Sequence, residues 1–383
     1  MNTISIVADN IFSPLGGSTA SNIEAILKGD SGIKRHAATD KLPFDYCGAK
    51  ISDDQFAKAS EDHKIDSSYT CLESMCIASI SQAINETALD LSSSEVGFII
   101  STTKGNIDLL KENDKNIKGK YLYHFASRIS KHFNNANKPV VISNACISGV
   151  LAIITAKRLL SIGDYKHIVV LGADLISDFT LSGFYALKAM SPDPCKPFDK
   201  NRTGINLGEA ASCIILSTET KSELPIQVHG GASSNDANHI SGPSRTGAGM
   251  ISVIKSSFGQ VEGFQKDKID FISAHGTGTL YNDEMEAKAI SNFDLNRTPI
   301  NSFKGYFGHT LGAAGILESI LTYHSLLRNT LFASKGFSES GTSEEINVLS
   351  KHVEKENLNW ALKTASGFGG CNAAILFKKR NDV

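Results

Sequence analysis

The repeated order of segments along this chain restricts its fold more than any single motif does. Short runs of apolar, mostly β-branched residues are each followed by small or glycine-rich residues and then by a helical stretch. Continuous apolar runs are typical of strands buried on both faces, as in sheets covered by helices on each side. We therefore expect an α/β fold with strands at 96–100, 140–143, 167–172, 269–273 and 373–377, and helices at 69–89, 148–160, 283–291 and 313–327.

The length and composition of the chain are consistent with a large hydrophobic core, and they show no obvious domain boundary. The chain has 383 residues, of which 41% are hydrophobic, which suits two or three domains' worth of mass and argues against disorder. A weak change in composition near 218–225 is the best candidate for a boundary and gives halves of 1–220 and 221–383. The near balance of 38 basic and 40 acidic residues excludes the global basic field of nucleic-acid binders.

The termini, apolar stretches and cysteines predict a cytoplasmic protein. The N-terminus lacks the basic region of a signal peptide, and the apolar stretch 149–160 is interrupted by Lys157 and Arg158. Seven scattered cysteines indicate free thiols in a reducing compartment and no disulfide framework. We expect neither a membrane nor a nucleic acid as partner.

Cys146 has the most distinctive local setting. It follows the apolar run 139–143 and precedes the helical stretch that begins near Ser148. A side chain at this position lies at the end of a sheet and near a helix N-terminus, where free N–H groups favour a thiolate and can hold an oxyanion. The alternative for any free cysteine is a buried, inert thiol, and we keep that interpretation for the other cysteines.

Two histidines occur in glycine-rich turns at the ends of predicted elements. His275 follows the strand 269–273 in Ala-His-Gly-Thr-Gly-Thr, and His309 precedes the helix 313–327 with Lys304 five residues upstream. A helix N-terminus disfavours the protonated imidazole and so favours a neutral N–H donor. A hydrogen-bonded loop histidine is the alternative for either residue alone. Open α/β sheets gather their chemistry at strand ends, which favours the functional interpretation of the set.

The remaining segments and motifs of the sequence indicate function less strongly. The glycines of 364–374 permit positive φ around Phe368, whereas the charged segment 196–211 is interpreted as a salt-bridged structural turn. No HExxH, CxxC, dinucleotide-binding or Walker motif is present, so no metal or nucleotide is expected. In the helix 313–327, the spacing places Glu318 and His324 on the face toward solvent.

These motifs together resemble those of the β-ketoacyl synthases, the elongating condensing enzymes with a thiolase-like fold. The resemblance rests on Asn-Ala-Cys146 with Ser-Gly, Pro-Phe-Asp-Lys-Asn-Arg with Gly-Glu, Ala-His275-Gly-Thr-Gly-Thr, Lys304 with Gly-His309, and Gly-Phe368-Gly-Gly, in family order over nearly the whole chain. It implies a thiolase-like five-layer αβαβα core of two similar halves, usually in a dimer. The internal duplication is not visible in the sequence.

The resemblance also implies a role for each motif residue. Cys146 would be the nucleophile that accepts the acyl chain, and His275 and His309 would form the decarboxylation site. Lys304 would orient and polarise that site, joined by Glu286. The implied substrate-binding residues are Thr277 and Thr279, which would hold the phosphopantetheine arm, Phe368, which would gate the acyl pocket and complete an oxyanion hole, and Asp283.

The implied reaction is the decarboxylative condensation of malonyl-carrier protein with a Cys-bound acyl chain, in fatty acid, polyketide or aryl-polyene synthesis. The phosphopantetheine arm arrives on the acyl carrier protein, so no bound cofactor is expected. Arg35, Lys34 and Arg128 are surface candidates for docking this carrier.

Two alternatives to this function are a coenzyme A-dependent acyltransferase and a non-catalytic chain-length partner in a heterodimer. Ile147, Ser366 and Cys371 depart from the common family pattern and favour specialised metabolism.

Overall fold

The computed structural model describes residues 3–40, 42–85, 87–110, 117–219, 225–236, 238, 240 and 242–380. The expected boundary between residues 220 and 221 lies outside the described residues, so the division into 1–220 and 221–383 stays a prediction.

Ten strands form one mixed sheet that consists of two equivalent halves. The order is β11-β10-β14-β15-β9-β1-β8-β6-β4-β5, and the halves meet at the pair Ser5–Gln227. In the first half β1, β8 and β6 are antiparallel neighbours, while β6, β4 and β5 are parallel. In the second half β9, β15 and β14 are antiparallel, while β14, β10 and β11 are parallel. This repeat of pairing is the duplication that the family resemblance implied.

The strands have the following bounds: β1 Ser5–Phe12, β4 Val96–Ser101, β5 Val140–Ile142, β6 His167–Asp174, β8 Ala210–Ser217, β9 Ile226–Asn235, β10 Phe271–Ser273, β11 Ile300–Asn301, β14 Trp360–Gly367 and β15 Cys371–Lys379. The five strands predicted from apolar runs all exist, with ends that differ by at most a few residues. Most are buried on both faces, as their continuous apolar character predicted.

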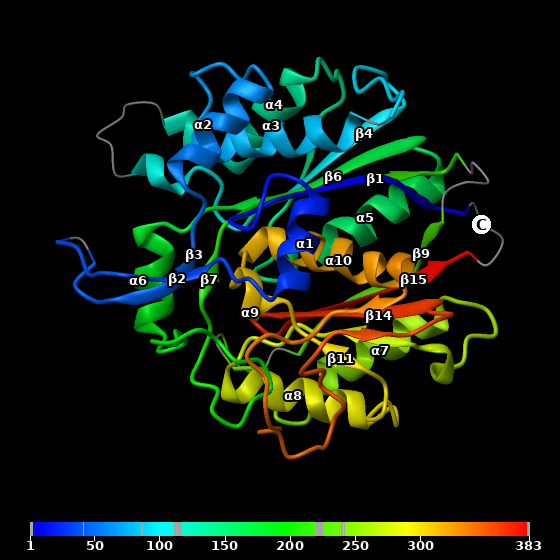
Figure 1. Ribbon diagram of the computed structural model, residues 1–383. Coiled ribbons are helices and arrows are strands. Elements are labelled where there is room, and N and C mark those ends of the chain that lie inside the picture. Colours follow the sequence, from blue (N-terminus) through cyan, green and yellow to red (C-terminus); the bar gives the residue numbers. More distant parts are fainter. Residues whose placement is uncertain are drawn as a thin grey trace.

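The two half-sheets and their helices form five layers (Figure 1). Helices α2 (Asp53–Asp62), α3 (Cys71–Ile84) and α4 (Leu122–His132) cover the outer face of the first half. Helices α7 (Ala248–Gly259) and α8 (Leu280–Ser291) cover the outer face of the second. Between the half-sheets lie α5 (Ser148–Ile162) and α10 (Ala314–Arg328), and the largest hydrophobic cluster surrounds these two helices.

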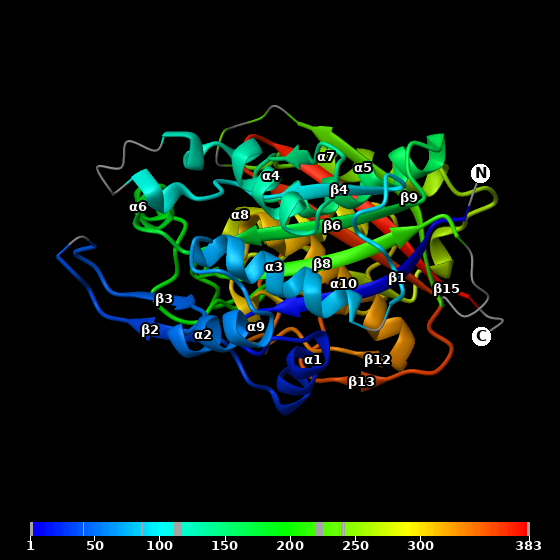
Figure 2. The same cartoon turned by 90° about the horizontal axis from the view of Figure 1, so that it is seen from above.

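The remaining elements surround this core. Figure 2 shows a hairpin of β2 (Ile33–His36) and β3 (Tyr46–Ala49) that extends from the body of the molecule. The other short elements are α1 (Thr19–Lys28), η1 (Ile107–Leu110), η2 (Ile117–Lys120), α6 (Asp178–Ala186), β7 (Leu207–Gly208), η3 (Lys266–Lys268), α9 (Lys304–Phe307), η4 (Leu311–Ala313), β12 (Thr330–Leu331) and β13 (Val353–Glu354).

Two glycines allow the central helices to approach each other closely. A Cβ atom on Gly149 would lie 2.8 Å from the backbone nitrogen of Ile316 and 2.9 Å from the Cα of Gly315. The segment Ala145–Ile162, which includes α5, is apolar enough to cross a membrane by composition, with a mean hydropathy of 1.7, yet it packs between the half-sheets. Its apolar character is therefore explained by its position in the central layer.

The boundaries of two helices and the place of one side chain differ from the prediction. Helix α3 is shorter than 69–89: Thr70 caps its start in a reciprocal capping box with Glu73, and the helix ends at Ile84, whose carbonyl accepts the Thr87 N–H. Helix α8 begins three residues before Asp283, at Leu280. The expectation that Glu318 faces solvent is wrong, because Glu318 is 3% exposed and lies between two buried lysines. His324 is partly buried against Asp9.

Candidate active site

Cys146 lies on a tight turn between β5 and α5. Ala145 adopts a left-handed backbone conformation with a φ of 44°, which reverses the chain at the end of the strand. The Ser148 hydroxyl secures the turn, since it accepts from the Asn144 N–H at 2.7 Å and donates to the Ala145 carbonyl at 2.6 Å. The strand–turn–helix arrangement predicted around Cys146 is therefore confirmed.

The surroundings of Cys146 favour the neutral thiol over the thiolate. Burial is the largest influence and raises the pKa of Cys146 to about 11, although Lys304, Lys104 and the backbone N–H of Phe368, which donates to the sulfur, oppose this effect. The prediction of a thiolate stabilised by the helix N-terminus is therefore not met in the resting protein. The desolvation of a buried charge outweighs the partial charges of the helix end.

His309 lies on a turn that contacts with Asn206 and Asp174, from two other segments, hold in place. Its backbone N–H donates to the Asn206 carbonyl at 2.7 Å, and the Asp174 carboxylate accepts the Gly312 N–H at 2.7 Å. The Nδ1 atom of His309 accepts the Leu311 N–H at 3.3 Å, which leaves the ring proton on Nε2. This Nε2 atom is buried and has no hydrogen-bond partner among the described residues. His309 therefore presents an unused N–H donor.

His275 is held from both sides at the end of β10. The Glu286 carboxylate accepts the backbone N–H groups of His275 and Gly276 at 2.8 and 2.6 Å. The Lys304 ammonium donates to the His275 carbonyl at 2.6 Å and lies 3.3 Å from its Nδ1. Because an ammonium can only donate, Nδ1 is the acceptor and the proton resides on Nε2. The lysine thus sets the tautomer of the ring.

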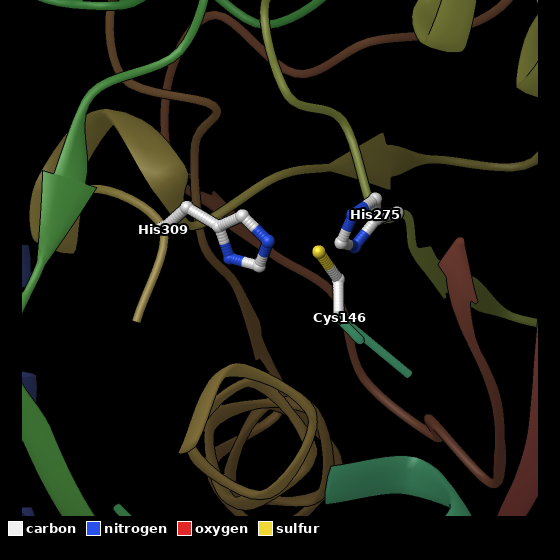
Figure 3. A group of neighbouring side chains, drawn as sticks. All are labelled: Cys146, His275 and His309. Carbon is white, nitrogen blue, oxygen red and sulfur yellow. The ribbon is translucent and has the colours of Figure 1, made fainter. Parts of the chain in front are cut away.

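These three side chains come from distant parts of the chain and meet at one point (Figure 3). The Cys146 sulfur and one nitrogen of each histidine all lie within 4.8 Å of one another, and the two rings are nearly perpendicular, 5.2 Å between centroids. Burial, with the Lys304 charge, holds the pKa of both histidines well below the usual range. The site therefore combines a thiol with two neutral N–H donors. By ligand type the set could hold zinc, and the expected absence of a metal stays a prediction.

The three groups line a cavity of about 420 Å³. Thr277 and Thr279 line the same cavity, with their hydroxyls 2.8 Å apart, and so does Phe368, whose ring stacks on Phe184 at 5.4 Å. Leu280 and Tyr281, which are 58% and 75% exposed, also line it and connect it to the surface. The cavity therefore offers a route from solvent to the Cys146 sulfur.

Three of the predicted site residues, Asp283, Glu286 and Lys304, are buried and do not line the cavity. Asp283 is fully buried and accepts the N–H groups of Phe198, Thr277 and Gly278. Glu286 supports the His275 turn, whereas the carboxylate that contacts Lys304 belongs to Glu318, at 2.6 Å. Neither Asp283 nor Glu286 lines the cavity. Both hold backbone segments in place and touch no reacting atom.

The charged segment 196–211 is a structural turn, as interpreted from the sequence. Asp199 accepts the N–H groups of Ser338 and Glu339, and Glu209 accepts those of Ile51 and Ile176. The segment also forms ion pairs, as expected, between Lys200 and Glu339 and between Arg202 and Asp283, the latter at 3.9 Å.

The candidates for carrier docking do not lie among the cavity-lining residues. Lys34 and Arg35 are exposed on β2, and Arg35 contacts Asp45 at 3.3 Å. Arg128 contacts the buried Glu73 at 3.0 Å and lies over the Tyr69 ring. Arg128 is therefore engaged in contacts within its own half.

Two buried charged residues near the site, Lys363 and Asp174, have no counterpart in the sequence-based prediction. Lys363 contacts Glu318 at 2.7 Å, and Asp174 accepts hydrogen bonds from Thr102, Thr103 and Gly312. The signal for Lys363 was present, since a lysine interrupts the apolar strand 360–367. A charge in a strand that is buried on both faces requires a partner.

Comparisons with known proteins agree over the length of the chain. The family model described as "Beta-ketoacyl synthase, N-terminal domain" matches residues 1–222, and "Beta-ketoacyl synthase, C-terminal domain" matches residues 226–338. The chain is 26% identical to the 3-oxoacyl-[acyl-carrier-protein] synthase 2 of Vibrio harveyi, over 96% of both chains. It is 26% identical to a putative mitochondrial 3-oxoacyl-[acyl-carrier-protein] synthase of Schizosaccharomyces pombe, over 99% of both.

A solved structure is similar in fold. A chain of the Xenorhabdus doucetiae complex of the ketosynthase ApeO with its chain length factor ApeC matches with a TM-score of 0.84. The match covers 99% of this chain and 98% of that chain at 24% identity.

Proposed function

The chain belongs to the β-ketoacyl synthase family, and we propose that it condenses malonyl-carrier protein with an acyl group carried on Cys146. The observation that carries this proposal is the meeting of one thiol and two neutral imidazole donors in a single cavity that reaches the surface. A thiol suits acyl transfer, and two N–H donors suit the stabilisation of an enolate.

In the first half-reaction, the Cys146 sulfur attacks the carbonyl carbon of a carrier-bound thioester. The bond from that carbon to the pantetheine sulfur breaks, and the thiol proton passes to the departing sulfur. The Phe368 N–H already donates to the Cys146 sulfur, so it is aimed at the place where the tetrahedral oxyanion develops. The Cys146 N–H is the second donor that the family resemblance implies.

In the second half-reaction, a malonyl thioester loses carbon dioxide and its electron pair remains as an enolate. The Nε2–H groups of His275 and His309 donate to the enolate oxygen, and Lys304 keeps His275 in the donating tautomer. The enolate carbon then attacks the acyl carbonyl on Cys146, a carbon–carbon bond forms, and the sulfur leaves as a thiolate that takes a proton from solvent when the product departs. Burial of the site excludes water from the intermediate.

The proposal also covers the partners and the location of the protein. We propose that an acyl carrier protein delivers both substrates through the cavity lined by Thr277 and Thr279, and that its arm replaces any bound cofactor. A dimer with a second copy or with a related ketosynthase subunit, and a cytoplasmic location, complete the proposal. The complex of ApeO with a chain length factor supports the heterodimeric form.

One experiment identifies the primer and tests the nucleophile together. The protein is incubated with acyl-carrier proteins of different chain lengths and, separately, with the matching acyl-coenzyme A thioesters, and its intact mass is measured. We expect the mass of the wild-type protein to rise by one acyl group after incubation with the acyl-carrier protein. The mass of Cys146→Ala should stay unchanged under the same conditions. Preferred transfer from coenzyme A would favour the coenzyme A-dependent alternative. Absence of acylation unless a second synthase subunit is added would favour the chain-length partner.

A further inference from the structure

Lys363 belongs to a buried group of charges beneath His275 that sequence analysis did not anticipate. Its ammonium lies 2.7 Å from one oxygen of Glu318, whose other oxygen lies 2.6 Å from the Lys304 ammonium. The side chains of both lysines are fully buried. One carboxylate therefore binds two ammonium groups, one of which also contacts Nδ1 of His275 at 3.3 Å.

Lys363 also contacts the strand that carries His275. Its ammonium donates to the carbonyls of Ser273 and Ala274, both at 3.3 Å, and to that of Thr364 at 2.7 Å. Ser273 and Ala274 immediately precede His275. Lys363 thus connects β14, β10 and, through Glu318, helix α10 at the position where the catalytic turn begins.

The charges around His275 balance only when Lys363 is counted. Four charged groups lie around His275: Lys304 from α9, Lys363 from β14, Glu318 from α10 and Glu286 from α8. The titratable side chains of His309 and Cys146 also face His275. Two ammonium groups therefore match two carboxylates. Without Lys363 the buried group would carry a net negative charge, which would favour a protonated His275.

We propose that Lys363 is a positioning residue that keeps His275 a neutral donor, by fixing Glu318 and by balancing the buried charges beneath the ring. The proposal rests on the proposed function for its consequence in catalysis. A protonated His275 would disturb the contact with Lys304, since Nδ1 would no longer accept a hydrogen bond. The expected consequence is a loss of decarboxylation on the acid side of the pH profile.

The test combines a direct titration of His275 with a pH profile. Histidine Cε1–H signals are followed by NMR in protein labelled with carbon-13 at histidine, and the His275 signal is assigned by its loss in His275→Gln. In the wild-type protein we expect His275 to titrate well below the ordinary histidine value of about 6.5, because burial and the Lys304 charge lower its pKa. In Lys363→Gln, which keeps a hydrogen-bond donor but removes the charge, we expect the midpoint to rise by about one pH unit or more.

Decarboxylation of malonyl-carrier protein is measured on the same samples. The acid limb of its profile should move upward with the His275 midpoint in Lys363→Gln and return to its wild-type position in Lys363→Arg. Lys379→Gln is the matched control, because it removes a partly buried lysine that also donates to a carbonyl, that of Leu326 at 3.1 Å. This control should change neither the titration nor the profile.

Three results would overturn the proposal. The first is a wild-type His275 that titrates near about pH 6.5, which requires no variant to be folded. The second is a folded Lys363→Gln whose titration and acid limb coincide with those of the wild type. The third is a Lys363→Arg that shows the same shifts as Lys363→Gln. If no sample decarboxylates at any pH, the proposed function fails, while the NMR titration still decides the role of Lys363.

Discussion

The reacting groups obtain their properties from contacts with a small number of neighbours. His309 donates from Nε2 because the Leu311 N–H occupies Nδ1, and His275 does so because the Lys304 ammonium faces Nδ1. A backbone amide and a lysine thus produce the same tautomer in two different ways. Both rings are then ready to donate to one oxygen without reorganisation, which is the condition for strong electrostatic catalysis.

Removing either histidine should separate the two half-reactions. We expect His275→Ala and His309→Ala each to slow malonyl decarboxylation by about 100- to 1000-fold, the usual effect of one lost oxyanion donor. Acylation of Cys146 should stay near the wild-type rate, because the thiol and the Phe368 N–H remain. Decarboxylation is measured as carbon dioxide release and acylation as intact mass. Equal losses in both assays would contradict the assigned roles.

The pH dependence of Cys146 alkylation should reveal a protected thiol. A group with a pKa of about 11 gains thiolate about tenfold per pH unit between about pH 7 and pH 9, so its reaction with iodoacetamide should accelerate by that factor. The exposed Cys71 is an internal control that reports thiol alkylation at the protein surface in the same sample. Peptide mass mapping measures both rates. A rate at Cys146 that is flat over this range would show that the thiolate already exists near neutrality.

At the level of elements, the site depends on how closely α5 and α10 approach each other. Helix α5 begins just after Cys146, and α10 follows the His309 turn, so the crossing at Gly149 and Gly315 brings nucleophile and donor together. A close approach of this kind requires glycine, because any Cβ atom would meet the backbone of the other helix.

Gly149→Ala should therefore destabilise the protein and disturb the site. The added Cβ would lie 2.8 Å from the Ile316 nitrogen, and overpacking of this kind costs about 1–3 kcal/mol. We expect a lower Tm and weaker condensation. Gly259→Ala is the matched control, since a Cβ there meets nothing within 4 Å and helical alanine is intrinsically favoured. Equal stability of the two variants in thermal unfolding would refute the importance of this crossing.

For the whole molecule, one edge of the sheet and one helix indicate assembly. Strand β5 ends the sheet at that edge and pairs with β4 alone among the described strands. Phe179 of α6 is 59% exposed and Leu110 of η1 is 55% exposed, and both line an open hollow on the surface. Unpaired strand edges and exposed apolar groups are features that a second subunit would cover.

Native mass spectrometry should therefore give a particle of about twice 41.1 kDa for the isolated chain. Phe179→Asp should weaken the dimer, because it places a charge in the hollow that the second subunit would cover. Ile162→Asp is the control, since Ile162 is 72% exposed but does not line the hollow. A monomer that dimerises only with a related ketosynthase subunit would favour the heterodimeric form. A monomer unaffected by either variant or partner would contradict the prediction.

The sequence by itself determined the local features. Apolar runs predicted five of the strands and helical periodicity predicted four of the helices, and the position of Cys146 between a strand and a helix followed from neighbours within a few residues. Glycine-rich turns likewise marked His275 and His309, and family motifs gave their expected roles. These features are local because backbone hydrogen bonds and side-chain periodicity depend on short separations along the chain.

Only the tertiary structure decided the properties that depend on burial and on distant contacts. It placed Glu318 between Lys304 and Lys363, assigned Glu286 to the backbone of the His275 turn, and raised the pKa of Cys146 where a helix end alone predicted a thiolate. It also revealed the repeated pairing of the half-sheets. Desolvation and ion pairing are set by the packing of separate elements against one another, and no local pattern contains that packing.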